Sequence, residues 1–163
     1  MQRKRLPKLA VLAAATPALA VGHAIGRIGC FLVGDDYGKP TDLPWGIAFP
    51  EGLPPTTVPV HPTQLYEAAA LVPLTIVLFH WRRQSRSDAL VLGAYLVLAG
   101  AIRFAIEFVR VNERVLGAMS VAHLASMAVI VLGAVLVLRR GRPLSTRRRQ
   151  ASRASDRVRP GER

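Results

Sequence analysis

The hydrophobic residues of this chain fall into four long runs separated by polar stretches. We expect a helix in each run, over residues 9–33, 62–81, 89–109 and 115–138. About twenty apolar residues are enough to cross the hydrocarbon core of a bilayer, and a single proline inside such a helix is tolerated. The pattern therefore predicts an all-α, multi-pass membrane protein with about four transmembrane helices.

The polar stretches predict loops and a tail. Residues 34–60 hold six prolines, which prevent a regular helix, so we expect a long loop there. Residues 82–88 form a short basic connection. Residues 139–163 are rich in arginine and serine and poor in large apolar side chains, which predicts a disordered basic tail. Residues 1–138 are then one transmembrane domain.

The distribution of charge orients the predicted helices. Lysine and arginine number 22 against 10 acidic residues, for a net charge of +12. The basic residues gather at the N-terminus, in the connection 82–88 and in the tail, and such segments stay in the cytoplasm. Four crossings place both termini and this connection on the same side. The acidic loop 34–60 and the short turn 110–114 then face outward.

Composition excludes some other classes of protein. A basic excess often indicates nucleic-acid binding, but here the basic residues flank apolar runs instead of forming one face, so no nucleic acid is expected. The start of the chain also resembles a secretory signal peptide. Because apolar character resumes beyond Arg27 and three more runs follow, a first transmembrane helix is favoured. Cys30 is the single cysteine, which excludes an internal disulfide framework and a cysteine-rich metal site.

The predicted orientation brings polar residues of all four helices toward the outer leaflet. A charged side chain at the centre of a membrane helix costs about 2.5 to 3.5 kcal/mol on insertion scales, so such residues usually mark a pathway or a site. We therefore expect an active site near the outer surface. The residues that converge there are Arg27, His61, Tyr66, Glu67, Arg103, Glu107, Ser120 and His123.

The arginines are the strongest candidates for binding an anion. Arg103 and Glu107 are four residues apart on one helix face and can pair, and a purely structural ion pair explains them equally well. Glu107 neutralises only one of the two arginines, Arg27 and Arg103, and the remaining positive charge calls for an anion. Arginine suits phosphate because its guanidinium is always charged and donates two hydrogen bonds as a fork. Arg27 alone could instead extend to the membrane interface.

The other polar candidates carry weaker signals. His61 precedes a proline and is more often a loop or cap residue than a base. Asp35 and Asp36 lack the further spaced ligands of a divalent-cation site, so no metal is expected. Tyr66 fits the aromatic belt of a membrane interface, and His123 fits a satisfied polar group in the core.

Three motifs resemble the prolipoprotein diacylglyceryl transferase family of bacterial inner membranes. They are G-R-x-G-N-F followed by a Gly-acidic pair and another Gly, then H-P-x-x-L-Y-E, then a helix with arginine and glutamate. The order and spacing agree over about residues 5–138. The matching residues are Gly26, Arg27, Gly29, Phe31, Gly34, Asp35, Gly38, His61, Pro62, Leu65, Tyr66, Glu67, Arg103, Phe104, Glu107 and Arg110.

The resemblance implies an activity and its partners. The enzyme would transfer the diacylglyceryl group of phosphatidylglycerol to the lipobox cysteine thiol of a prolipoprotein, the first step of lipoprotein maturation, and release glycerol phosphate. Its partners would be these two substrates and membrane lipid. It would reside in the bacterial plasma membrane, and the sequence gives no sign of a metal or organic cofactor.

The resemblance also implies roles for individual residues. Arg27 and Arg103 would hold the headgroup and stabilise the charge that develops on the phosphate, and Glu107 would orient Arg103. The residues expected to shape the headgroup pocket are Gly29, Gly38 and Tyr66.

The chain departs from the family pattern in two places. Cys30 stands where many members have asparagine. Members usually have about seven membrane helices and an earlier His-Gly-Gly element whose histidine is a candidate base, whereas this chain starts at what resembles the fourth helix. His61 could substitute as the base. An inactive relative that binds anionic lipid or a membrane partner stays open, and so does a small carrier or channel, although transport sites usually lie near the midplane.

Overall fold

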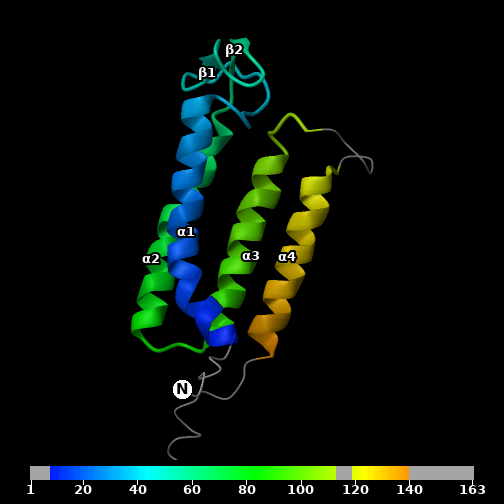
Figure 1. Cartoon of the computed structure of the whole chain (residues 1–163). Helices are drawn as coiled ribbons and strands as arrows, with labels where there is room; N and C mark the ends of the chain where they lie inside the picture. Colours follow the sequence, from blue (N-terminus) through cyan, green and yellow to red (C-terminus); the bar gives the residue numbers. More distant parts are fainter. Residues whose placement is uncertain (1–7, 113–118, 140–163) are drawn as a thin grey trace, which may run out of the picture.

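The computed structural model describes residues 8–112 and 119–139. Figure 1 shows four helices, α1 (Lys8–Val33), α2 (Thr63–Arg83), α3 (Asp88–Glu107) and α4 (Val121–Leu138). Each is long and apolar enough to cross a membrane. The predicted helical, membrane-spanning fold class is confirmed. Of the predicted tail, only Arg139 is described, as the C-cap of α4. Residues 115–118 of the last predicted helix also lie outside the described residues.

Two helix pairs form the bundle. In Figure 1, α1 lies beside α2 and α3 lies beside α4, with α3 between α1 and α4. Buried side chains from α1, α2 and α3 form the core, and large apolar side chains elsewhere remain exposed, as a lipid-facing surface requires. The core residues are Ala20, Leu71, Leu74, Leu78 and Val91.

Glycines allow α3 and α4 to approach closely. A Cβ atom built on Gly133 would lie 2.7 Å from the carbonyl oxygen of Gly93, and a Cβ on Gly93 would lie 2.7 Å from that of Gly133. About two turns further along α3, a Cβ on Gly100 would lie 2.9 Å from the side chain of Ile130. Small residues at such contacts are typical of helix packing in membranes.

This contact predicts opposite effects for two glycine-to-alanine substitutions. Gly133→Ala places a methyl group against backbone, so we expect a loss of about 1–3 kcal/mol of stability from overpacking. Gly22→Ala is the matched control, since no atom lies within 4 Å of its added Cβ and alanine favours helix over glycine. Thermal unfolding in detergent should show a lower midpoint for Gly133→Ala and an equal or higher midpoint for Gly22→Ala. Equal midpoints for the two variants would contradict this packing.

The loop between α1 and α2 contains a small sheet that the sequence pattern did not predict. Strands β1 (Ile47–Phe49) and β2 (Thr56–Val60) pair antiparallel at one end of the bundle, called here the loop end (Figure 1). Phe49 packs on Tyr37 and Phe31, with ring centroids 5.6 and 5.7 Å apart. These aromatic contacts attach the sheet to the end of α1.

Candidate functional site

A tight turn after α1 places two aspartates over the start of α2. Gly34 ends α1 with a φ of 73°, and Asp36 adopts a φ of 61°, both in the left-handed region. The Thr63 hydroxyl donates to the carbonyl oxygen of Asp36 at 2.8 Å, and the Gln64 amide donates to that of Asp35. The first turn of α2 therefore holds the backbone of the turn that carries Asp36.

Glu67 on α2 holds two side chains of α1. Its carboxylate is almost fully buried, with a side-chain exposure of 2%. One oxygen lies 3.1 Å from Nε2 of His23, and the other lies 3.1 Å from Nε of Arg27. His23 and Arg27 are four residues apart and share one face of α1. A single buried carboxylate thus orients an imidazole and a guanidinium side by side.

Asp36 joins Arg27 to the end of α3. Arg27 Nη1 donates to one Asp36 oxygen at 2.9 Å, and Arg110 donates to the other. Burial raises the pKa of Asp36, but the hydrogen bonds and charges of Arg110 and Arg27 outweigh it and hold the pKa below its ordinary value. The bridge between α1 and the end of α3 is therefore ionised at neutral pH.

This bridge predicts a pH dependence for the loop end. Because the pKa of Asp36 is lowered by folding, its stabilising effect is complete above the unfolded value of about 3.9 and is lost as the pH falls through the folded value. We expect hydrogen-exchange protection of the amides of Gly38 and Lys39 to fall only below about pH 4. Asp36→Asn should show weaker protection at neutral pH and no further loss on acidification. Identical profiles in both proteins would rule out the bridge.

A second network surrounds Glu107. Arg103 Nη2 lies 3.1 Å from one carboxylate oxygen, and the Ser120 hydroxyl donates to the other at 2.6 Å. Asn112 also donates to this carboxylate. Ser120 caps α4, and its backbone N–H donates to Nδ1 of His123, whose ring packs against Phe104 and Phe108. Glu107 therefore links the end of α3 to the start of α4.

The positive charge is balanced more fully than the sequence led us to expect. Glu107 pairs with only one of Arg27 and Arg103, as expected, but the expected surplus of positive charge on the other is wrong. Arg27 contacts both Glu67 and Asp36, Arg103 contacts Glu107, and Arg110 contacts Asp36. The net charge of these groups therefore does not call for an anion, and only individual hydrogen-bond donors can favour one.

One such donor is Nη1 of Arg103. This atom is buried and has no hydrogen-bond partner within residues 8–112 and 119–139. A buried donor without a partner costs about 1–3 kcal/mol, so its presence needs an explanation. A ligand acceptor would satisfy it.

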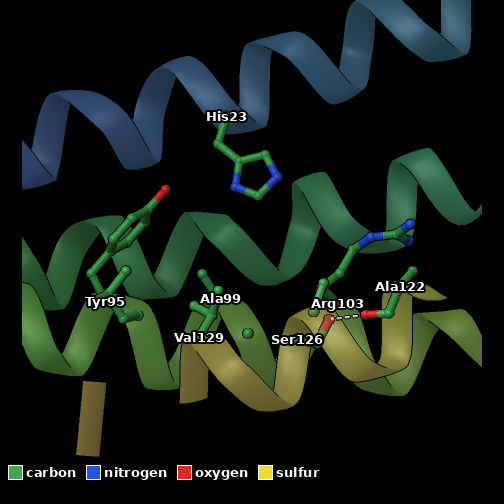
Figure 2. Close-up of a pocket in the computed structure, with 10 residues that line it drawn as sticks. His23, Tyr95, Ala99, Arg103, Ala122, Ser126 and Val129 are labelled. Atoms are coloured by element: carbon green, nitrogen blue, oxygen red, sulfur yellow. Dashed lines mark hydrogen bonds between the residues drawn. The ribbon is translucent and has the colours of Figure 1, made fainter. Parts of the chain in front are cut away.

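Arg103 lines a cavity of about 340 Å³ between α1, α3 and α4. Figure 2 shows His23 projecting toward this space from α1, opposite Arg103 and Tyr95 of α3 and Ser126 of α4. The remaining wall is apolar, from Leu96, Ala99, Gly100, Ala122, Ala125 and Val129. An apolar cavity with a few polar residues is the usual form of a small-molecule site, and here the polar residues are His23, Tyr95, Arg103 and Ser126.

The other predicted site residues do not line this cavity. The Tyr66 hydroxyl accepts a hydrogen bond from Trp45 at 2.8 Å and lies 3.2 Å from Nδ1 of His61. Gly29 lies on an exposed face of α1, and no atom lies within 4 Å of an added Cβ. The Gly38 N–H donates to the carbonyl oxygen of His61, and a Cβ there would lie 2.7 Å from the backbone oxygen of Val109, just after α3. Gly38 thus allows three backbone segments to meet.

Sequence reasoning gave no role to His23 and no specific contact to Glu67. The available signal for His23 was a polar residue within an apolar helix, one turn before Arg27 and on the same face. Its contact with Glu67 joins residues 44 apart, which depends on how α1 and α2 are rotated against each other.

Cys30, Asp35 and Asp36 bring potential metal ligands within 4.8 Å of one another. Both oxygens of Asp36 already accept hydrogen bonds from arginines. Asp36 in this group is therefore part of the ion-pair network with Arg27 and Arg110.

Comparison with known proteins finds the same family by two routes, a family model and individual relatives. Residues 1–139 match the family model described as prolipoprotein diacylglyceryl transferase. A relative from Cupriavidus metallidurans, named phosphatidylglycerol–prolipoprotein diacylglyceryl transferase, is 41% identical over 127 residues, covering 75% of this chain and 46% of the relative. Relatives of the same name from Finegoldia magna and Geobacter sulfurreducens are 34% and 41% identical, covering 85% and 76% of this chain and 54% and 50% of their own length. The chain spans about half the length of these curated relatives.

Proposed function

We propose that this chain, which belongs to the prolipoprotein diacylglyceryl transferase family, carries the part of the active site that binds the phosphatidylglycerol headgroup and performs the transfer. The family resemblance seen in the sequence is confirmed by these matches. The proposed reaction moves the diacylglyceryl group from phosphatidylglycerol to the lipobox cysteine thiol of a prolipoprotein and releases glycerol phosphate.

The proposal rests on one observation, that Nη1 of Arg103 is buried without a hydrogen-bond partner among the described residues. A phosphate oxygen in the cavity would accept the hydrogen bond that this buried donor lacks among the described residues. Glu107 holds the opposite nitrogen of the same guanidinium at 3.1 Å. It therefore acts as a positioning residue that directs Nη1 toward the ligand.

The charge balance of the reaction explains why arginines are needed. A thiolate attacks the glyceryl carbon that bears the phosphate, the sulfur–carbon bond forms and the carbon–oxygen bond breaks. The phosphate begins as a diester with one negative charge and leaves as glycerol phosphate with two. Arg103 and Arg27 would stabilise the charge as it develops, which is how preorganised donors accelerate a reaction.

The remaining assignments are supported by the local surroundings of each residue. The open face at Gly29 leaves room for a lipid headgroup, and the group formed by Tyr66, Trp45 and His61 lies at the loop end. We propose that Tyr66 and Gly38 shape the approach to the site and that His61 stays a candidate base. We also propose that the loop end faces outward and that both termini are cytoplasmic, in the bacterial plasma membrane.

The test is glycerol phosphate release by the purified chain in detergent or nanodiscs. Release should require both phosphatidylglycerol and a lipobox peptide, and should stop when the peptide cysteine is replaced by alanine. Circular dichroism would establish that the protein is helical in the same sample. No release from folded protein would overturn the proposal and leave an inactive relative as the better description.

A further inference from the structure

We propose that His23 is the base that takes the proton from the substrate thiol. The inference rests on the proposed function and adds a residue to it. The attacking species is a thiolate, and a free cysteine with a pKa near 8.5 is ionised only to a few per cent at pH 7. The reaction therefore needs a group near the site that can accept this proton.

His23 lies where such a base must lie. It lines the same cavity as Arg103, so the nucleophile and the phosphate would be held by opposite walls (Figure 2). Its side chain is 31% exposed, which leaves the ring accessible to a substrate. His61, in contrast, has its Nδ1 against the Tyr66 hydroxyl at 3.2 Å and does not line the cavity.

Glu67 prepares the imidazole for this role. The carboxylate lies 3.1 Å from Nε2, so in the neutral ring Nε2 carries the hydrogen and donates it to Glu67. Nδ1 then carries the lone pair, and it has no hydrogen-bond partner in the part of the chain that the structure describes. A histidine oriented by a buried carboxylate is the arrangement used by catalytic bases in many enzymes.

The charges around His23 suit a proton acceptor. Glu67 of α2 stabilises the imidazolium, while Arg27 of α1 and Arg103 of α3 oppose it. Tyr95 of α3 also faces the cavity, and α4 contributes only Ser126 as a polar residue. Because Arg27 and Arg103 are each paired with a carboxylate, their opposition to the imidazolium is reduced.

The proton transfer completes the balance of the reaction. Nδ1 of His23 takes the proton from the thiol, and the thiolate forms the bond to the glyceryl carbon. The carbon–oxygen bond breaks and its electron pair leaves with glycerol phosphate. The imidazolium then gives its proton to the departing phosphate or to water, which restores the base.

The first test separates loss of the base from loss of the fold. His23→Gln should lower release by about 10²- to 10⁴-fold, the usual contribution of a general base. A lipobox peptide with selenocysteine in place of cysteine, whose selenol is ionised at neutral pH, should recover most of this loss. His80→Gln is the matched control, since His80 is exposed near the far end of α2 and its Nε2 contacts only Gln84 among the described residues.

Two outcomes of this test would overturn the inference. The first is thiol-dependent release by His23→Gln at the wild-type rate. The second is that His61→Gln loses release and the selenol peptide restores it, whereas the selenol peptide does not restore release by His23→Gln. Absence of release by the wild-type chain with either nucleophile would instead count against the proposed function.

A second test requires no turnover. The chain would be labelled with ¹⁵N-histidine and placed in nanodiscs without phosphatidylglycerol. The Nδ1 resonance of His23, assigned by its absence in His23→Gln, should shift when a cysteine lipobox peptide is added and should respond less to the alanine peptide. An Nδ1 resonance that responds identically to both peptides would overturn the inference, whether or not the chain is active.

Discussion

Arg103→Gln is expected to lower glycerol phosphate release by about 10²- to 10³-fold, which corresponds to about 2.7–4 kcal/mol of transition-state stabilisation. Glutamine keeps much of the length of the side chain but removes the charge and the forked donors. Arg103→Lys should give an intermediate rate, because lysine keeps the charge without the planar fork of two nitrogens. The measurement is the rate at saturating phosphatidylglycerol.

The control for this substitution is Arg86→Gln in the connection between α2 and α3. Arg86 is exposed and its guanidinium contacts only Gln84 among the described residues. The Arg86→Gln variant should transfer the diacylglyceryl group at the wild-type rate. If Arg103→Gln inserts into the membrane normally and also keeps the wild-type rate, the pair of Arg103 with Glu107 is a structural ion pair and the site assignment fails.

The helices could be predicted from the sequence because length and apolar content decide whether a segment crosses a bilayer. The predicted range 62–81 differs from α2 by one residue at its start and two at its end, and 89–109 differs from α3 by one and two. Ends of this kind depend on capping. Ser87 accepts from the backbone N–H of Leu90 and so starts α3 one residue before the apolar run.

The candidate site could be predicted only in part. Arg103 and Glu107 were expected to pair because residues four apart on a helix always share a face, and they do. The contacts of Glu67 with His23 and Arg27 depend on the rotation of α1 against α2, which the linear pattern does not contain. For the same reason the ion-pair balance of Arg27 was misjudged.

The small sheet shows a further limit of sequence reasoning. The prolines of the loop exclude helix, and this led to the expectation of a long loop over residues 34–60. A short edge strand can nevertheless contain proline, and β2 contains Pro59. What organises the loop is the packing of Phe49 on Tyr37 and Phe31, contacts that no local pattern reveals.

Glu67→Gln should have the broadest effect of any single substitution in the site. The change preserves shape but removes the negative charge that faces His23 and one of the two carboxylates that pair with Arg27. We expect a loss of transfer at least as large as that of His23→Gln. Glu51→Gln is the control, since Glu51 is exposed in the loop, and it should keep the wild-type rate.

The effect of Glu67→Gln on stability tests whether charge is the cause. Removing one partner of a buried ion pair typically costs about 3–5 kcal/mol, and the cost here should be smaller because Arg27 keeps its contact with Asp36. Replacing both partners of a buried pair is cheaper than replacing one. The double variant Arg27→Gln/Glu67→Gln should therefore unfold at a higher temperature than Glu67→Gln, while transfer stays lost.

This pair of variants separates two roles that one carboxylate performs. A double variant no more stable than Glu67→Gln would mean that Glu67 acts by packing and not by pairing with Arg27. Recovery of stability without recovery of transfer is the expected result, because the double variant removes the Arg27 charge that has lost its Glu67 partner but does not restore the carboxylate that orients His23. Stability and chemistry in this site would then depend on the same buried oxygen atoms for different reasons.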